Sequence, residues 1–199
     1  MSYNSINEPS VGKHIPNTRL HLMTRRVYAF TLVELVVTLA VAAILITVAA
    51  PNLRTFIQNT RIITQVNALK TDLTMARNKS IGSPAGIGVC RSINGTSCAG
   101  GGLWANGRLI FVDSNNNRQW DAGEIVLQFR EALVAGNTLT TTPAIPDPLI
   151  FSQGMASNLG AGAASFIFCD NRGPTFGKQI NFLTATGLST VDANAPGGC

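Results

Sequence analysis

The strongest constraint on this chain is a largely apolar run of 21 residues, Phe30 to Ala50, that contains a single charged side chain. About 20 such residues cross the hydrocarbon core of a bilayer as a helix. Arg25 and Arg26 precede the run, and basic residues in that position hold their end of a membrane helix in the cytoplasm. The sequence therefore predicts a transmembrane segment over residues 30–50. The residues after this segment are expected on the side of the membrane opposite to the cytoplasm.

The charged side chain of this run, Glu34, separates three interpretations of the N-terminal region. A secretory signal has a shorter apolar core with a cleavage site at its far end, which does not fit a run of this length. A plain membrane anchor explains the length and the arginines, but a carboxylate in hydrocarbon costs ~2.5 kcal/mol or more. Only an interpretation that gives Glu34 a role explains why the acid is kept.

The stretch Ala29-Phe30-Thr31-Leu32-Val33-Glu34-Leu35 resembles the type IV prepilin processing site. The resemblance implies that a dedicated prepilin peptidase cuts between Ala29 and Phe30 and that Phe30 is then N-methylated. Ala29 stands where the family usually has Gly. The resemblance further implies that Glu34 pairs with the α-amino group of a neighbouring subunit in a filament, so that two charges neutralise each other in an apolar surrounding.

Residues 1–29 are expected to be a leader that the mature protein lacks. A start at Met23 would give a seven-residue basic leader of the usual type, Met-Thr-Arg-Arg-Val-Tyr-Ala, so translation from Met1 and translation from Met23 both stay open. Residues 30–50 form the transmembrane and assembly helix, residues 51–81 continue that helix, and residues 82–199 form a periplasmic head.

The helix is expected to continue beyond the membrane segment. Pro51 lacks an N–H donor and should kink the helix there, which makes it a candidate assembly residue. From Leu53 to Ala76 apolar residues recur at spacings of three and four, the pattern of an amphipathic helix that packs on a core. One helix from Phe30 to near Ile81 would be about 75 Å long.

After Gly82-Ser83-Pro84, short β-prone runs alternate with turn signals, which predicts a β-rich head. The fold class is therefore α+β, with a long N-terminal helix packed on a small antiparallel sheet, as in pilins. The expected strands are Ile87–Arg91, Arg108–Asp113, Glu124–Arg130, Leu149–Ser152, Ser165–Asp170, Lys178–Thr184 and Leu188–Val191.

Charge and composition argue against catalysis and against a strong interaction with nucleic acid. The first 29 residues hold four of the 15 basic residues and one of the ten acidic ones, which leaves 11 and 9 in the mature chain, a net charge of +2. Such a chain lacks a strong electrostatic footprint for nucleic acid. His14 and His21 both lie in the leader, so the mature protein has no histidine base, and we expect it not to be an enzyme.

All four cysteines follow the membrane segment and are expected in an oxidising compartment, where an even number indicates two disulfides with three possible pairings. The sequence VCRSINGTSC turns back through Asn94-Gly95, which favours Cys90–Cys98 and leaves Cys169–Cys199. A zinc site is disfavoured, because the spacing fits no zinc motif and the mature chain has no histidine.

Three elements of the head, VCRSINGTSC, GRLIFVDSNNNRQWDAGE and FIFCDNRG, resemble those of FimT/FimU-type minor pilins, which include the GspH-type pseudopilins of type II secretion. The resemblance implies a subunit held in the bacterial inner membrane and then moved into the tip of a pilus or pseudopilus. Its implied partners are other minor and major pilins, the prepilin peptidase and the pilus assembly platform. A role in type II secretion is the alternative.

The segment from Asp113 to Glu124 has oxygen donors at the spacing of a calcium-binding EF-hand loop: Asp113, Asn115, Asn117, Asp121 and Glu124. The glycine that such a loop needs is replaced by Arg118, and strands rather than helices are expected on both sides. A β-hairpin loop whose Asp and Asn side chains cap their own backbone is favoured over a calcium site. No other cofactor is expected.

Some FimT-like pilins bind DNA through a C-terminal Gly-Arg-x-Arg stretch, which makes DNA uptake a further alternative. The comparable place here reads Thr186-Gly-Leu-Ser-Thr190 and contains no arginine. Arg172 and Lys178 are the remaining candidates for contact with phosphate, but two cations near Asp170 are more typical of a solvated surface. DNA is therefore not the favoured partner.

Overall fold

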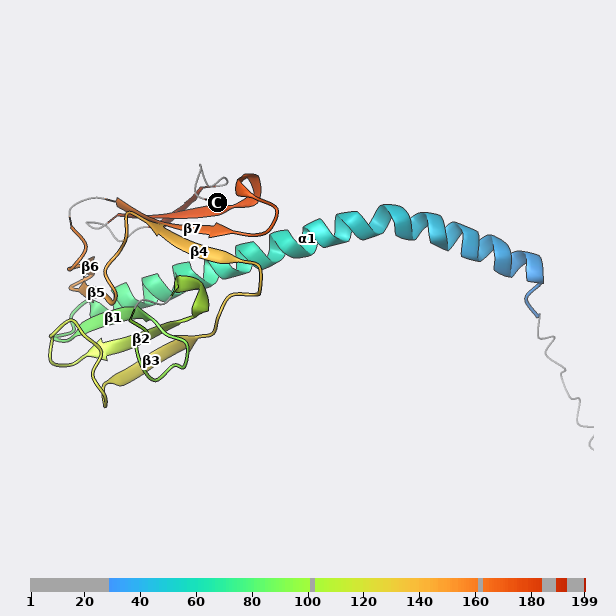
Figure 1. Ribbon diagram of the computed structural model, residues 1–199. Coiled ribbons are helices and arrows are strands. Elements are labelled where there is room, and N and C mark those ends of the chain that lie inside the picture. The colour runs from blue at the N-terminus through green and yellow to red at the C-terminus, as the bar shows by residue number, and fades with distance from the viewer. Residues whose placement is uncertain (1–28, 101–102, 161–162, 184–188, 193–198) are drawn as a thin grey trace, which may run out of the picture. The chain divides into compact units, whose positions relative to one another are not determined.

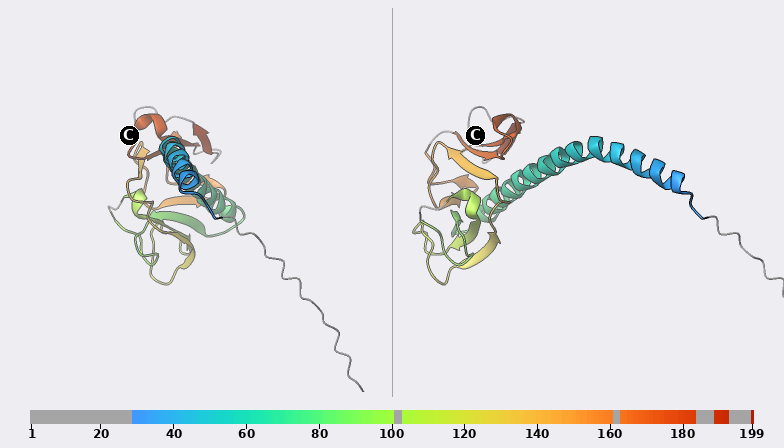
Figure 2. Two further views of the ribbon diagram at one scale, coloured as in Figure 1. Left: turned by 90° about the vertical axis from the view of Figure 1, so that its right-hand side faces the viewer. Right: turned by 45° about the vertical axis from the view of Figure 1, so that its right-hand side comes forward.

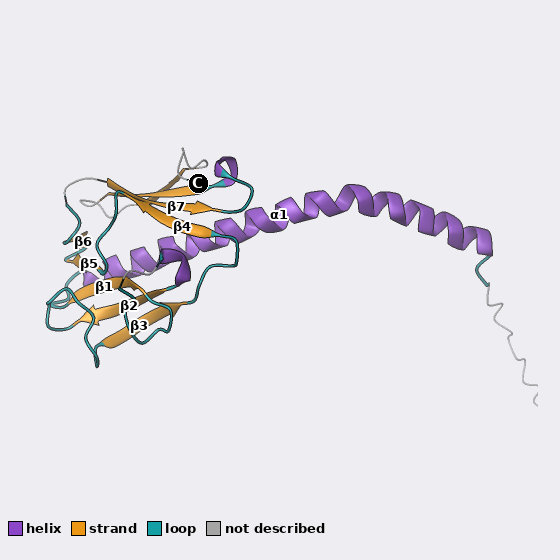
Figure 3. Cartoon of the chain, viewed as in Figure 1, coloured by secondary structure: helices purple, strands orange, loops and turns teal. Residues whose placement is uncertain are grey.

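The computed structural model describes residues 29–100, 103–160, 163–183, 189–192 and 199 (Figure 1). The chain divides into two compact units, residues 1–46 and 47–199. The leader predicted for residues 1–29, with the alternative start at Met23, lies outside the described residues except for Ala29. The described chain contains one long helix, two antiparallel sheets and two short 3₁₀ helices, η1 (Trp104–Asn106) and η2 (Pro174–Phe176) (Figure 3).

Helix α1 spans Leu32–Ser80, close to the predicted limits. Pro51 lies inside it, so the helix is not ended there, although the ring removes one backbone donor. The helix stops where Gly82 takes a left-handed conformation with φ of 72°, which glycine adopts at little cost.

The first sheet has five strands in the order β3-β2-β1-β5-β6, and the second has four in the order β4-β7-β8-β9. Every pairing between neighbouring strands is antiparallel. The strands of the first sheet are β1 (Gly86–Arg91), β2 (Arg108–Asp113), β3 (Ile125–Arg130), β5 (Leu149–Ser152) and β6 (Met155–Ala156). Those of the second sheet are β4 (Thr138–Thr142), β7 (Ala163–Cys169), β8 (Lys178–Leu183) and β9 (Ser189–Asp192).

One hydrophobic core joins α1 to both sheets within residues 47–199. The apolar stripe of α1 supplies Ile62, Val66, Leu69, Leu73 and Ala76. The first sheet contributes residues of β1, β2 and β5, and the second contributes residues of β4, β7 and β8. The C-terminal part of α1 accordingly lies between the two sheets (Figures 1 and 2). Because this stripe packs against both sheets, the amphipathic pattern of α1 extends from Ile62 to Ala76.

A smaller cluster covers the other face of the first sheet, built from Leu109, Phe111 and Ile150 with Trp120 against them. The Phe111 and Trp120 rings meet edge to face with centroids 5.1 Å apart. Gly88 makes this possible, because a Cβ there would overlap the Phe111 ring. The disulfide Cys90–Cys98 lies beside the cluster and joins residues whose Cα atoms are 5.7 Å apart.

The head differs from the sequence prediction in two respects. It has two sheets rather than one, because β7, β8 and β9 form a sheet of their own, which includes the unpredicted strand β4 paired with β7. The sequence of β4, Thr-Leu-Thr-Thr-Thr, has one apolar residue, so its contact with the core rests on Leu139, which is 2% exposed. The second unpredicted strand, β6, has two residues and follows a tight turn at Gln153 and Gly154, both with positive φ.

Candidate functional site

The predicted cleavage point lies just outside α1. Ala29 and Phe30 are exposed and precede the first helical residue, Leu32. The Phe30 side chain is 78% exposed. A non-helical, exposed segment is the backbone conformation that a peptidase needs in order to reach a bond. The cut itself and the N-methylation of Phe30 stay predictions.

Thr31 caps the N-terminus of α1, where the backbone N–H of Glu34 is its partner. The Glu34 N–H donates to Oγ1 of Thr31 at 3.2 Å, and the Leu35 N–H donates to the Thr31 carbonyl at 3.2 Å. A Thr at the cap followed by a Glu three residues later is the sequence pattern of a capping box, and the structure shows the half of it in which the Thr31 side chain accepts from the Glu34 N–H. The capping role of Thr31 was not predicted from the sequence.

The position of Glu34 in the first turn has an electrostatic consequence. The N-terminus of a helix carries partial positive charge, and an acid there stabilises the helix. Cutting before Phe30 would add an ammonium group at the same end. Glu34 is then the acid available to compensate that charge, in its own chain or in a neighbouring one.

The apolar part of α1 is open to its surroundings. Its large side chains between Leu32 and Ile46 are each more than half exposed. Among the described residues α1 is the one helix long and apolar enough to cross a membrane. A helix that is hydrophobic on all sides is buried in lipid or among other helices when it functions.

Between α1 and the first sheet lies a charge cluster that the sequence analysis missed. Asp72 of α1 is fully buried, and its Oδ2 accepts a hydrogen bond of 2.7 Å from Nε of Arg108 on β2. Arg130 on β3 donates to Oδ1 of the same carboxylate at 3.2 Å. Burial lowers the pKa of the Arg108 guanidinium, while the charge of Asp72 and its hydrogen bond act in the opposite direction. The cluster fixes the helix to two adjacent strands.

Arg172, a candidate for contact with DNA, is held by its own chain. It donates to Asp170 at 2.6 Å and to Oδ1 of Asn59 on α1 at 2.8 Å, and its guanidinium lies 4.3 Å from the centroid of the Phe176 ring. These contacts tie the turn between β7 and β8 to the helix. Lys178, the other candidate, begins β8. The contacts of Arg172 therefore indicate a structural role within the head.

The loop considered for calcium is a hairpin connection between β2 and β3. Asp113 accepts hydrogen bonds from the N–H groups of Asn117 and Arg118, both at 3.0 Å. Glu124 accepts from the Ser114 N–H at 2.9 Å and the Asp121 N–H at 3.1 Å. The two carboxylates therefore cap their own loop, as the favoured interpretation expects. In the part of the chain that the structure describes, no three His, Cys, Asp or Glu side chains form a group suited to a metal.

Both predicted disulfides are present. Cys90–Cys98 closes a loop beside β1, and Cys169–Cys199 joins the last residue of β7 to the last residue of the chain. The described residues contain no free cysteine. Position 187 and its neighbours, compared above with the DNA-binding stretch of FimT-like pilins, fall in 184–188, outside the described residues.

Comparison with known proteins agrees with this architecture. The family model for the type II transport protein GspH matches residues 65–186, and the prokaryotic N-terminal methylation motif matches residues 24–50. A crystal structure of the type IV minor pilin FimU of Pseudomonas aeruginosa is similar with 16% sequence identity, covering 69% of this chain and 92% of that one, at a TM-score of 0.52. No curated protein sequence matches this chain.

The minor pseudopilin EpsH from the type 2 secretion system of Vibrio cholerae is also among the similar structures, with 13% identity, 69% of this chain and 98% of that chain covered, and a TM-score of 0.43. The likeness to FimU shows the pilin fold. The GspH model covers more than half of the residues, and the methylation motif precedes it on the same chain. This chain belongs to the GspH family of minor pilins and pseudopilins.

Proposed function

We propose that this protein is a minor pilin or pseudopilin that helps to initiate or cap a type IV pilus, in a tip or priming complex with other minor and major pilins. The observation that carries the proposal is the position of Glu34, in the first turn of α1, where the helix up to Ile46 is otherwise apolar and exposed. A carboxylate at this place is unfavourable in lipid, but it is compensated when a second subunit brings a positive amino terminus to it.

The proposed sequence of events follows from the two parts of the chain. The prepilin peptidase removes residues 1–29 on the cytoplasmic side and methylates Phe30. The mature protein then stays in the bacterial inner membrane through residues 30–50, with its head in the periplasm. The assembly platform extracts the protein from the membrane, and α1 exchanges its contacts with lipid for contacts with neighbouring helices. Lipid tails and apolar side chains are similarly apolar, so van der Waals packing between the helices stabilises the new contacts.

The test is a pair of substitutions at Glu34. Glu34→Gln keeps the length of the side chain and removes its charge, whereas Glu34→Ala removes both. We expect both variants to insert in the membrane in normal amounts and to be at least about tenfold depleted from sheared filaments, because an uncompensated ammonium remains in an apolar surrounding. Immunoblots of membrane and filament fractions measure this.

Thr38→Val is the matched control. Thr38 lies on the same helix, and its hydroxyl donates to the Leu35 carbonyl of that helix at 2.8 Å, so loss of the hydroxyl should leave incorporation unchanged. Normal incorporation of Glu34→Gln would show that the charge of Glu34 has no part in assembly and that its role is limited to the helix start.

A second candidate is a pseudopilin of type II secretion, which the description of the matching family model favours. The two candidates differ in the machine that uses the subunit and share the same chemistry at Phe30 and Glu34. Deletion of the gene separates them, because loss of surface pili with normal secretion indicates the pilus and the reverse result indicates secretion. DNA binding gains no support from Arg172, whose charge is held by Asp170 and Asn59.

A further inference from the structure

The part of α1 that follows the predicted membrane segment carries apolar side chains outside the core of the head. Leu53, Phe56 and Ile57 recur at spacings of three and four, so they share one side of the helix, and all three are exposed. The buried stripe of α1 begins only at Ile62. The exposed apolar surface of the membrane segment therefore continues for about two turns beyond its predicted end.

The length of a membrane span places this stretch at the edge of the bilayer. About 20 helical residues cross the hydrocarbon core. Counted from Phe30, such a span ends at Ala50; counted from Glu34, whose charge favours the headgroup layer, it ends near Leu53. In both cases Phe56 follows within about 9 Å along the helix axis. That is the depth at which apolar side chains contact the boundary between headgroups and acyl chains.

The charged side chains of this stretch are all basic. Between Glu34 and Asp72 the chain has Arg54, Arg61 and Lys70 and no acid. Arg54 and Arg61 are exposed and have no ion pair with the described residues. Apolar and basic residues together at the edge of a membrane are typical of a segment that contacts anionic lipid.

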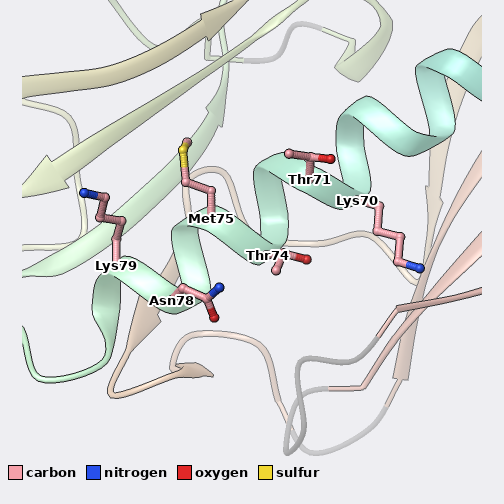
Figure 4. A pocket seen from close by; sticks show the side chains of 6 residues that line it. All are labelled: Lys70, Thr71, Thr74, Met75, Asn78 and Lys79. Atoms are coloured by element: carbon pink, nitrogen blue, oxygen red, sulfur yellow. The ribbon is translucent and has the colours of Figure 1, made fainter.

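Arg61 also lines a small polar pocket of about 110 Å³, which we call the turn pocket. Three separate parts of the chain form it: Gln58 and Arg61 of α1, the turn 134–137 before β4, and Asp170 with Asn171 after β7. A larger groove of about 640 Å³ lies farther along α1, over Thr71, Thr74 and Met75 (Figure 4). The described lining of that groove belongs to one helix, so only the turn pocket is closed from several sides.

Both turns of the pocket are held in place by α1. Nδ2 of Asn137 donates to Oε1 of Gln65 at 2.7 Å, and Nε2 of Gln58 donates to Oδ1 of Asn171 at 3.4 Å. Gly136 has a positive φ of 89°, and a Cβ there would have no atom within 4 Å, so the turn leaves open space above it. The pocket is thus formed by contacts within the chain.

Arg61 supplies the uncompensated charge of the turn pocket. Asp170 lines the pocket as well, but Arg172 donates to its carboxylate at 2.6 Å and compensates that charge. A guanidinium binds phosphate through two parallel N–H bonds, and the amide groups of Gln58 and Asn171 lie in the same lining. This combination suits a phosphate group with a single negative charge.

We propose that the turn pocket binds the phosphate of an anionic phospholipid while the protein is stored in the membrane. Leu53, Phe56 and Ile57 then lie at the boundary between the headgroups and the acyl chains. Arg61 is about 12 Å beyond Leu53 along the axis, and its side chain leans toward the N-terminus of the helix, which is toward the membrane. The proposal rests on membrane storage in the proposed function and adds a lipid preference to it.

A tryptophan reporter tests the depth of this stretch. Phe56→Trp is introduced into the full-length protein in nanodiscs, with lipids that carry quenching bromine atoms at the headgroup end of their chains. The signal of Trp104 and Trp120 is subtracted with the parent protein. We expect strong quenching of Phe56→Trp and none of Thr74→Trp, which lies about 27 Å farther along the helix. An unquenched Phe56→Trp would overturn the proposal.

The same reporter measures the lipid preference. Phosphatidylglycerol is the minor lipid of the discs and phosphatidylcholine the major one, with bromine on one or the other. We expect phosphatidylglycerol to surround the reporter about fivefold in excess of its share of the lipid, the attraction of one basic residue at a membrane surface. Added salt should weaken the preference.

Variants of the protein assign the preference to the pocket. Arg61→Gln should remove most of it, and Arg61→Lys should keep only part, because an ammonium group cannot bind phosphate as a fork. Ala135→Phe fills the pocket without changing charge and should also remove most of the preference. Lys70→Gln is the matched control, since it removes an exposed cation of the same helix outside the pocket and should change nothing. All these positions are exposed, so circular dichroism should show the variants folded.

Quenching in proportion to the share of each lipid, or a preference that survives Arg61→Gln or Ala135→Phe, would overturn the proposal. Inorganic phosphate, compared with chloride at equal ionic strength, separates the two sources of a phosphate group. It should leave the preference unchanged; a preference lost in phosphate alone would show that the pocket binds the free ion instead of the lipid. None of these results bears on Glu34, whose test is incorporation into filaments, so the turn pocket and the proposed function can fail separately.

Discussion

At the scale of single residues, Asp72 is a buried carboxylate that pairs with two arginines of the head. Arg108 and Arg130 lie directly opposite each other on β2 and β3, where two like charges repel. One buried carboxylate from α1 compensates both. A buried charge cluster of this kind contributes little net stability as a whole, but removing one member leaves an uncompensated charge behind.

We therefore predict that Asp72→Leu lowers the free energy of unfolding by about 3–5 kcal/mol, because Arg108 stays buried without its partner. Asp72→Leu combined with Arg108→Met should recover a large part of this loss, since an apolar pair of similar volume needs no compensation. Chemical denaturation of the full-length variants in detergent, followed by tryptophan fluorescence, measures both. A double variant no more stable than Asp72→Leu would show that the carboxylate acts through something other than this charge pairing.

At the scale of elements, the turn between β7 and β8 is joined to α1 through Asp170 and Arg172. Burial by itself would raise the pKa of Asp170, but the hydrogen bonds and charge of Arg172 outweigh it and hold that pKa below its usual value. A carboxylate whose pKa is lower in the folded state contributes stability above its unfolded pKa, near 4, and loses it as the pH falls through the folded pKa.

Stability should accordingly fall as the pH drops below about 4, and part of that fall should be absent in Asp170→Asn. Thermal unfolding of the two proteins between neutral and acid pH measures the difference. The expected result is that the melting temperatures differ at neutral pH and converge in acid. Parallel curves over the whole range would contradict the role given to the Asp170 charge.

The elements that could be predicted are those whose pattern is local. The spacing of apolar residues predicted α1 to within two residues at its start and one at its end, and the apolar run of β2 predicted its limits. The turn at Asn94-Gly95 likewise led to the Cys90–Cys98 pairing. In each case the determining residues are close together in the sequence.

What could not be predicted depends on partners far along the chain. Strand β4 has weak apolar patterning and is defined by its pairing with β7. The Asp72 cluster joins residues 36 and 58 positions apart, and its two arginines face each other only through the register of β2 and β3. The capping role of Thr31 could have been predicted, because Thr-x-x-Glu before an apolar run is a known helix start.

At the scale of the whole molecule, the two units differ in what they expose and what they bury. Residues 30–46 supply an apolar helix with one acid at its start, which suits storage in a membrane and reuse in a filament. Residues 47–199 supply a head whose core encloses the apolar stripe of α1.

The central claim is that the mature protein begins at Phe30, and the intact mass of the protein recovered from membranes of cells that contain the prepilin peptidase tests it most directly. We predict the mass of residues 30–199 with one added methyl group and with four hydrogens fewer for two disulfides. A mass that includes Ala29 and the residues before it would contradict the account, because Glu34 would then have no processed amino terminus to pair with.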